Sequence, residues 1–142
     1  MALHLIKLCV GADSVADMQD WVSQRAAANR KAGRGNVTQH TTRMFPKRRP
    51  DILSGGSIYW VIKGAVLIRQ RIVDLAPVAG DDGIARCEIV LDPTLHPTHA
   101  QPRRAFQGWR YLKPEDAPAD LDRKSANSPP ELRAKLAELG LL

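Results

Sequence analysis

Hydrophobic residues near the start of the chain recur first with the period of a strand and then with the period of a helix. Residues 2–9 alternate enough between apolar and polar side chains to predict a strand. Apolar residues then recur every three or four positions and predict a helix over 14–30, with Asp13 or Ser14 as the N-cap. We expect Met18 and Trp21, on the apolar stripe of this helix, to lie in the core.

The strongest strand signal lies in the middle of the chain. Residues 57–62 and 65–75 are rich in β-branched and aromatic side chains, and Lys63-Gly64 between them predicts the turn of a hairpin. Residues 92–104 hold three prolines and no periodicity, which predicts a long surface loop. Shorter elements are expected as strands over 36–43, 84–91 and 106–112, and as a helical turn over 51–54.

The end of the chain differs in composition from the middle. After Pro114 the sequence becomes acidic and proline-rich, and a last helix is expected over 130–139. A run of strands between two terminal helices predicts an α+β fold, either a small mixed or antiparallel β-barrel or a strongly bent sheet. We expect a single domain over 1–142, with a basic β core over about 36–112 and an acidic helical tail over about 114–142.

The predicted hairpin also determines which side chains share a face of the sheet. If its turn has two residues, Trp60 lies opposite Leu67, and Trp60, Arg69 and Arg71 share one face because side chains alternate across a strand. A tryptophan ring beside two guanidinium groups can stack a base and hold phosphates. In the alternative arrangement Trp60 packs beneath a helix and the arginines pair with acids. A shift of one residue in register would exchange the two faces.

Positive charge is concentrated in two segments. The net charge is +6, but residues 30–71 carry ten basic side chains and one acidic, and residues 96–113 carry four basic and none acidic. Clustered positive charge is typical of proteins that bind a polyanion, although many basic surfaces only maintain solubility. The charge distribution therefore makes nucleic acid a candidate partner, and a basic surface that only maintains solubility is the alternative.

Each basic segment contains a compact cluster. The first, which we call the basic elbow, is residues 43–49, between Thr42 and Pro50. In the second, over 102–112, three arginines lie beside Trp109 and Tyr111. Arginine next to aromatic rings is suited to binding phosphates and stacking bases. The candidate nucleic-acid-binding residues are Arg43, Lys47, Arg48, Arg49, Trp60, Arg69, Arg71, Arg103, Arg104, Trp109 and Arg110.

Evidence for catalysis, metals or cofactors is weak. His40, Lys63 and Asp92 are the candidate acid–base groups, although side chains of this kind are more often ordinary polar surface residues. His96-x-x-His99 lacks the helical spacing and acidic partner of a zinc-hydrolase motif, so no metal is expected. No phosphate-cradling glycine loop or dinucleotide fingerprint occurs, so we expect no cofactor.

The cysteines and the lengths of the apolar runs indicate the cellular compartment in which we expect the protein. Cys9 and Cys87 each lie in an apolar stretch and are expected to be buried free thiols in a reducing environment; a disulfide or a reactive pair is the alternative. No apolar run approaches the roughly 18 residues that span a bilayer, and the N-terminus lacks the features of a signal peptide. We therefore expect a cytoplasmic protein without a membrane partner.

The predicted C-terminal helix offers a third kind of function. Leu132, Leu136 and Leu139 form an apolar stripe that could dock a protein partner, although such a stripe usually packs on its own domain. Nothing in the sequence points to a particular oligomeric state.

Several strings resemble a known family. They are 40–48, 55–64, 69–72, 91–93 and 102–112. Over nearly the whole chain they are similar to an alphaproteobacterial family called domain of unknown function 1489, which implies no activity. The segment 59–63 and the basic strand after it also resemble parts of PUA-like barrels, including the ASCH and EVE groups. That resemblance implies binding of RNA or modified bases, and in a few members hydrolysis of modified nucleosides.

The leading hypothesis is a non-enzymatic RNA-binding module of PUA-like type. In it, arginine and lysine hold phosphates while a tryptophan surface stacks a base. The alternatives are an enzyme acting on a nucleotide or modified nucleobase and a protein-interaction subunit.

Overall fold

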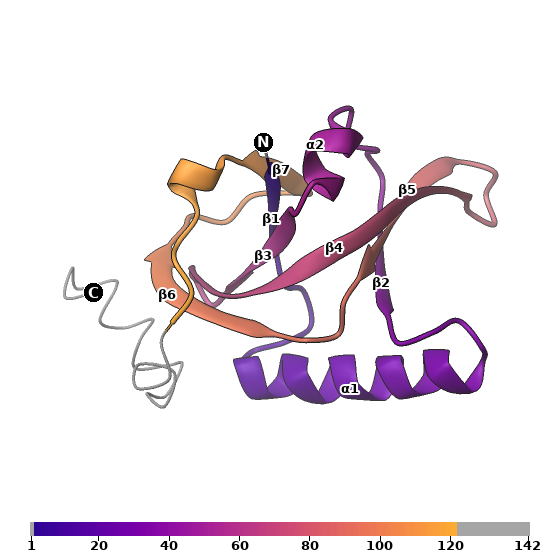
Figure 1. The fold of residues 1–142 in the computed structure, drawn as a ribbon, viewed down its shortest axis with the longest axis horizontal. Helices are drawn as coiled ribbons and strands as arrows, with labels where there is room; N and C mark the ends of the chain where they lie inside the picture. Colours follow the sequence, from indigo (N-terminus) through magenta and orange to yellow (C-terminus); the bar gives the residue numbers. More distant parts are fainter. Residues whose placement is uncertain (1, 122–142) are drawn as a thin grey trace.

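A computed structural model describes residues 2–121 (Figure 1). No helix within this range is long and apolar enough to cross a bilayer. The elements are β1 (His4–Leu8), α1 (Val15–Lys31), β2 (Thr38–Thr42), α2 (Arg49–Leu53), β3 (Ser57–Ile62), β4 (Ala65–Ala79), β5 (Ala85–Leu91), β6 (His96–Pro102), β7 (Trp109–Leu112) and a 3-10 turn, η1 (Pro114–Asp116).

The strands form a seven-stranded mixed sheet around the long strand β4. Its order is β2-β5-β4-β3-β1-β7, with β6 as a further partner of β4. The first part of β4 pairs with β3 and β6, and the second part pairs with β5. All pairs are antiparallel except β1 with β3, because the chain returns from β1 to β3 through α1, β2 and α2. Figure 1 shows β4 crossing the molecule with β3 and β1 near one end and β5 and β2 near the other.

The sheet is open, so the barrel that we considered from the sequence does not form. The end strands β2 and β7 pair with β5 and β1 and not with each other. Instead of a closing strand, α1 covers part of the core with Met18 and Val22. The coarser prediction of a sheet-rich fold with an N-terminal helix is confirmed, while the predicted helix over 130–139 lies outside the described residues.

Local signals predicted several elements well. Ser14 caps α1, and its side chain accepts a hydrogen bond from the backbone N–H of Asp17 (3.1 Å). The hairpin turn has Lys63 and Gly64 at φ 49° and 85°, the conformation of a tight two-residue turn.

The prediction of a loop over 92–104 was wrong, because β6 lies inside this range. Among the named strands β6 pairs with β4, and its other edge meets residues 119–121, where the backbone N–H of His99 donates to Ala119 (2.9 Å) and that of Leu121 donates to Pro97 (3.0 Å). Pro97 has no N–H to donate, but its carbonyl oxygen accepts one of these bonds, so the strand tolerates the proline.

An irregularity in the hairpin exchanges the predicted faces. The register shifts between Trp60 and Val61, so Trp60 lies opposite Ile68 rather than Leu67, and Arg69 lies opposite Tyr59. A bulge of this kind moves every later side chain to the other face. The prediction that Trp60 and the two arginines share a face was therefore wrong. Trp60 is only 3% exposed, and its Nε1–H donates to Oε1 of Gln70 (2.9 Å).

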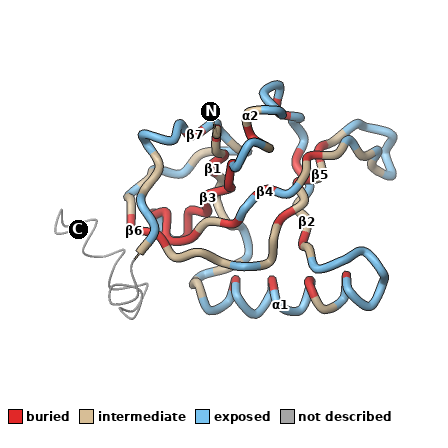
Figure 2. Tube along the Cα trace, viewed as in Figure 1, coloured by how far each residue is buried: buried red, intermediate tan, exposed pale blue. Residues whose placement is uncertain are grey.

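Hydrophobic side chains pack on both sides of the sheet. The larger cluster lies beneath α1 and contains Leu5, Met18 and Trp60, while the smaller one contains Ile6 and Tyr59. All six residues of β3 are buried, and Figure 2 shows buried positions concentrated in β3 and the adjoining part of β4. Because both faces of these strands are buried, side chains that could contact a ligand lie at the ends of the sheet and on α1.

Candidate nucleic-acid interface

The basic elbow is held against β7, far away in the sequence. Trp109 Nε1–H donates to the backbone oxygen of Met44 (2.9 Å). The Tyr111 hydroxyl accepts from the backbone N–H groups of Lys47 (3.0 Å) and Arg48 (3.4 Å). The two rings also meet edge to face, with centroids 4.9 Å apart. These contacts bring together the two basic segments that the sequence singled out.

The charges of the elbow have different surroundings. Arg49 is tied to β4, because its guanidinium donates to Asp74 (2.6 Å) and to the backbone oxygen of Leu75 (3.0 Å). Arg48 pairs with Asp51 in an exposed ion pair of 3.0 Å, which is worth little in water. Arg43 and Lys47 are exposed and have no side-chain hydrogen bond or ion pair within residues 2–121.

A shallow groove of about 950 Å³ runs beside β7 and continues this positive surface. Arg103 lines it and donates to the neutral amide oxygen of Gln101 (3.0 and 2.7 Å), so its charge is not neutralised there. The guanidinium of Arg110 lies 5.0 Å from the ring centroid of Phe106. Arg104 is exposed and has no polar partner in the described part of the chain. The acids lining the groove are Glu115 and Asp116.

Tyr111 joins the elbow to the groove. Its ring lines the groove, while its hydroxyl binds the backbone of the elbow. We call the combined surface the basic junction, defined by Arg43, Lys47, Arg48, Arg103, Arg104 and Arg110 around Tyr111. Large apolar side chains are exposed here too: Met44 is 68%, Phe45 38% and Tyr111 39% exposed. Positive charge and exposed rings therefore share one region.

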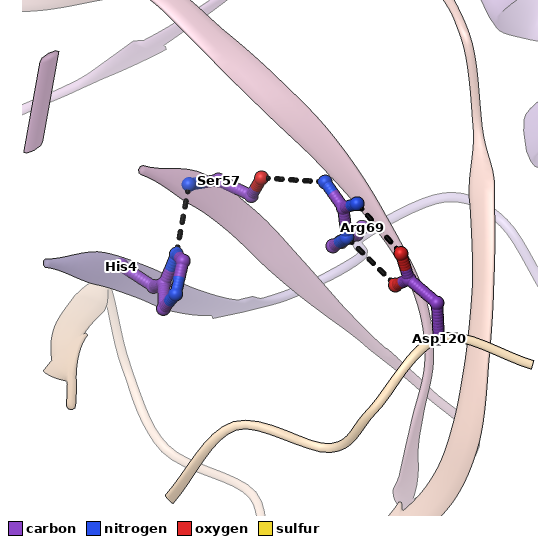
Figure 3. A network of polar contacts seen from close by, with 4 residues as sticks. All are labelled: His4, Ser57, Arg69 and Asp120. Carbon is purple, nitrogen blue, oxygen red and sulfur yellow. Dashed lines mark hydrogen bonds and ion pairs between the residues drawn. The ribbon is translucent and has the colours of Figure 1, made fainter. Parts of the chain in front are cut away.

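Arg69 and Arg71 lie elsewhere. Arg69 donates twice to Asp120 (2.8 and 2.7 Å) and once to Oγ of Ser57 (3.0 Å), as Figure 3 shows. His4 Nδ1 accepts from the backbone N–H of Ser57 (3.0 Å), and burial, followed by the charge of Arg69, lowers the pKa of His4. This network ties the segment after η1 to the sheet. Arg71 is exposed on β4, opposite Ser57.

The candidate acid–base groups are not assembled into one site. His40 lines a cavity of about 610 Å³ between α1, β2 and the loop that follows β1, with Trp60 as a neighbour. Lys63 lies in the hairpin turn, and Asp92 caps its own turn by accepting from the backbone N–H of Thr94 (2.9 Å). Neither lines the cavity.

Sequence reasoning missed part of this cavity. Trp21, which was expected in the core, is 40% exposed and lines the cavity wall, so that prediction was wrong. The guanidinium of Arg25 lies 4.3 Å from the ring centroid of Trp21. The spacing of four residues between them places both on one helix face, and this was the available signal.

The cysteines are free, and both thiols have a raised pKa. Cys87 is buried, whereas Cys9 is only partly buried and lines the cavity. Burial raises the pKa of each thiol to about 11, which keeps both protonated near neutral pH. Within residues 2–121 no three His, Cys, Asp or Glu side chains are grouped as metal ligands.

Comparison with known proteins establishes a family. A family model described as a protein of unknown function, DUF1489, matches residues 5–142. The chain belongs to the DUF1489 family. No curated protein and no solved structure matches it, so the resemblance to PUA-like barrels stays a prediction. The description of DUF1489 names no activity.

Proposed function

We propose that this DUF1489 protein is a binding module for single-stranded RNA, and that the strand lies across the basic junction. The observation that carries the proposal is the meeting at Tyr111 of the basic elbow and the cluster over 102–112, which more than 50 residues separate in the sequence. A chain that needed positive charge only for solubility would not require this convergence.

The charges at the junction are available to phosphates. Arg43, Lys47 and Arg104 have no acidic partner within residues 2–121, so a phosphate would not have to displace an existing ion pair. Arg48 would exchange an exposed contact with Asp51, which costs little. Arg103 is oriented by Gln101 and keeps its full charge. These residues are suited to a backbone that carries one negative charge per nucleotide.

Exposed rings at the junction favour a single strand over a duplex. Phe45 and Tyr111 present apolar surface beside the arginines, and unstacked bases gain about 1–3 kcal/mol each by stacking on such rings. In a duplex the bases are already stacked, and a narrow groove would offer little to these side chains. Trp60 has no part in this proposal, because it is buried in the core.

The test is fluorescence anisotropy with labelled single-stranded RNA, duplex RNA and single-stranded DNA. We expect Arg43→Ala with Lys47→Ala, and separately Arg103→Ala with Arg104→Ala, to weaken RNA binding at least fivefold. The matched control is Arg30→Ala with Lys31→Ala, which removes the same charge at the end of α1, away from β7 in Figure 1. Equal losses in all three variants would mean non-specific attraction by net charge, and would contradict the proposed surface.

A further inference from the structure

The cavity between α1 and the sheet is separate from the basic junction. Its volume of about 610 Å³ lies within the range of small-molecule sites, and it shares no lining residue with the groove beside β7. Its walls come from the loop after β1 (residues 9–12), from residues 17–25 of α1 and from the middle of β2, and Trp60 contributes from β3. A ligand in this cavity would therefore bind independently of RNA at the junction.

His40 brings unused hydrogen-bonding capacity to this cavity. Its ring meets Trp60 edge to face, with centroids 5.5 Å apart, and neither ring nitrogen has a hydrogen-bond partner within residues 2–121. Burial, and then the charges of Lys7 and Arg25, lower the pKa of His40 to about 4. The imidazole is therefore neutral near pH 7, with one nitrogen as a donor and the other as an acceptor.

A second polar group is held in a defined orientation. The side-chain oxygen of Gln39 accepts from Nδ2 of Asn29 (2.7 Å), and the same nitrogen donates to the backbone oxygen of Val37 (2.6 Å). With its oxygen engaged, Gln39 retains its amide nitrogen as a donor, and this nitrogen has no partner in the described part of the chain. Gln39 and His40 both line the cavity, but consecutive side chains of a strand lie on opposite faces, so the imidazole of His40 is the polar group that a ligand beside Trp60 and Trp21 would meet.

Aromatic surface completes the cavity. Trp21 is 40% exposed, which is unusual for so large an apolar side chain, and Arg25 supports its ring. Trp60 is 3% exposed and its Nε1–H donates to Gln70, so it closes the inner wall of the cavity behind His40. Charges of both signs line the walls, namely Asp17, Asp20 and Arg25 of α1, so the lining selects neither a strongly cationic nor a strongly anionic ligand.

The geometry points to a binding site for an uncharged planar nitrogen heterocycle, which contacts the ring of Trp21 and exchanges hydrogen bonds with His40. A flat ring suits the indole surface of Trp21, and ring nitrogens or carbonyls suit the donor and acceptor nitrogens of a neutral imidazole. An apolar ring would leave these polar groups unsatisfied. Free nucleosides and nicotinamide both have this chemistry, so the test includes both.

The test is isothermal titration calorimetry of the full chain with adenosine, guanosine, cytidine, uridine and nicotinamide, and with indole as a planar probe that lacks a ring acceptor. We expect at least one heterocycle to bind at least tenfold more tightly than indole. His40→Phe keeps a flat ring but removes both nitrogens, and should weaken that heterocycle about tenfold without changing the affinity for indole. His99→Phe, at an exposed position of β6, is the matched control and should bind as the wild type does.

Three results would overturn the assignment. They are no heterocycle binding at millimolar concentration, indole binding as tightly as the heterocycles, and a folded His40→Phe that retains full heterocycle affinity. Near-ultraviolet circular dichroism checks that the variant keeps its tertiary packing. Arg103→Ala with Arg104→Ala should leave heterocycle affinity unchanged, so failure of this proposal and failure of RNA binding at the junction give different results.

Discussion

Replacing His40 by glutamine should flatten the dependence of stability on pH in the acidic range. The pKa of His40 is about 4 in the folded chain, against an ordinary value of 6.5. Between these values the unfolded chain binds a proton that the folded chain excludes, so the free energy of unfolding falls as pH falls through this window. Above 6.5 both states carry a neutral imidazole, and His40 contributes no pH dependence.

The size of the effect follows from the difference in pKa. A shift from 6.5 to about 4 corresponds to at most about 3 kcal/mol lost by the wild type at the lower end of the window. Solvent reaches His40 through the cavity and screens part of this cost, so we expect about 1–2 kcal/mol. Glutamine cannot take up a proton, so the variant should escape this loss.

The assay is urea unfolding at several pH values from 4 to 7, with the wild type, His40→Gln and the control His99→Gln. The difference in unfolding free energy between wild type and His40→Gln should change by about 1–2 kcal/mol across the window. A constant difference would show that the folded chain does not exclude the proton from His40, and would refute the reasoning.

Three other substitutions test contacts that position the basic junction and the core. Tyr111→Phe removes the acceptor for two backbone N–H groups of the basic elbow and should lower the free energy of unfolding by about 0.5–1.5 kcal/mol in urea titration, with weaker RNA binding. Asp120→Ala removes the carboxylate that accepts two hydrogen bonds from Arg69, and should lower the free energy of unfolding by only about 1 kcal/mol because the pair is partly exposed. Amide hydrogen exchange in the segment after η1 should become faster, and an unchanged exchange rate would contradict this. Gln70→Leu leaves Nε1 of Trp60 buried without its acceptor and should cost about 1–3 kcal/mol, whereas wild-type stability would show that water replaces the amide.

Elements that depend on local signals were predictable from the sequence. The helix began at Ser14 because its hydroxyl caps the first turn, and Lys63-Gly64 formed the hairpin turn because both residues adopt positive φ. The bulge after Trp60 carries no such signal, since both registers place apolar side chains on both faces of β3. It therefore reversed the predicted positions of Trp60 and Arg69.

The candidate site was predictable in composition but not in arrangement. Clustered arginines marked both basic segments, yet their meeting depends on Trp109 and Tyr111 reaching across from β7 to the elbow. Contacts between residues so distant in sequence have no periodicity that could reveal them. The cavity was missed for a related reason, because the spacing of Trp21 on α1 fits a buried stripe and does not show that the neighbouring sheet leaves space beside it.

The most direct test of RNA binding at the basic junction is the salt dependence of affinity for single-stranded RNA, in the wild type and in Arg103→Ala with Arg104→Ala. Each phosphate contact contributes about 0.7 to the slope of the logarithm of affinity against the logarithm of salt concentration. We predict a steep slope in the wild type and a slope shallower by about 1.4 in the variant, corresponding to two lost contacts. Identical slopes would remove these arginines from the interface, and no binding by the wild type at low salt would contradict the proposed function.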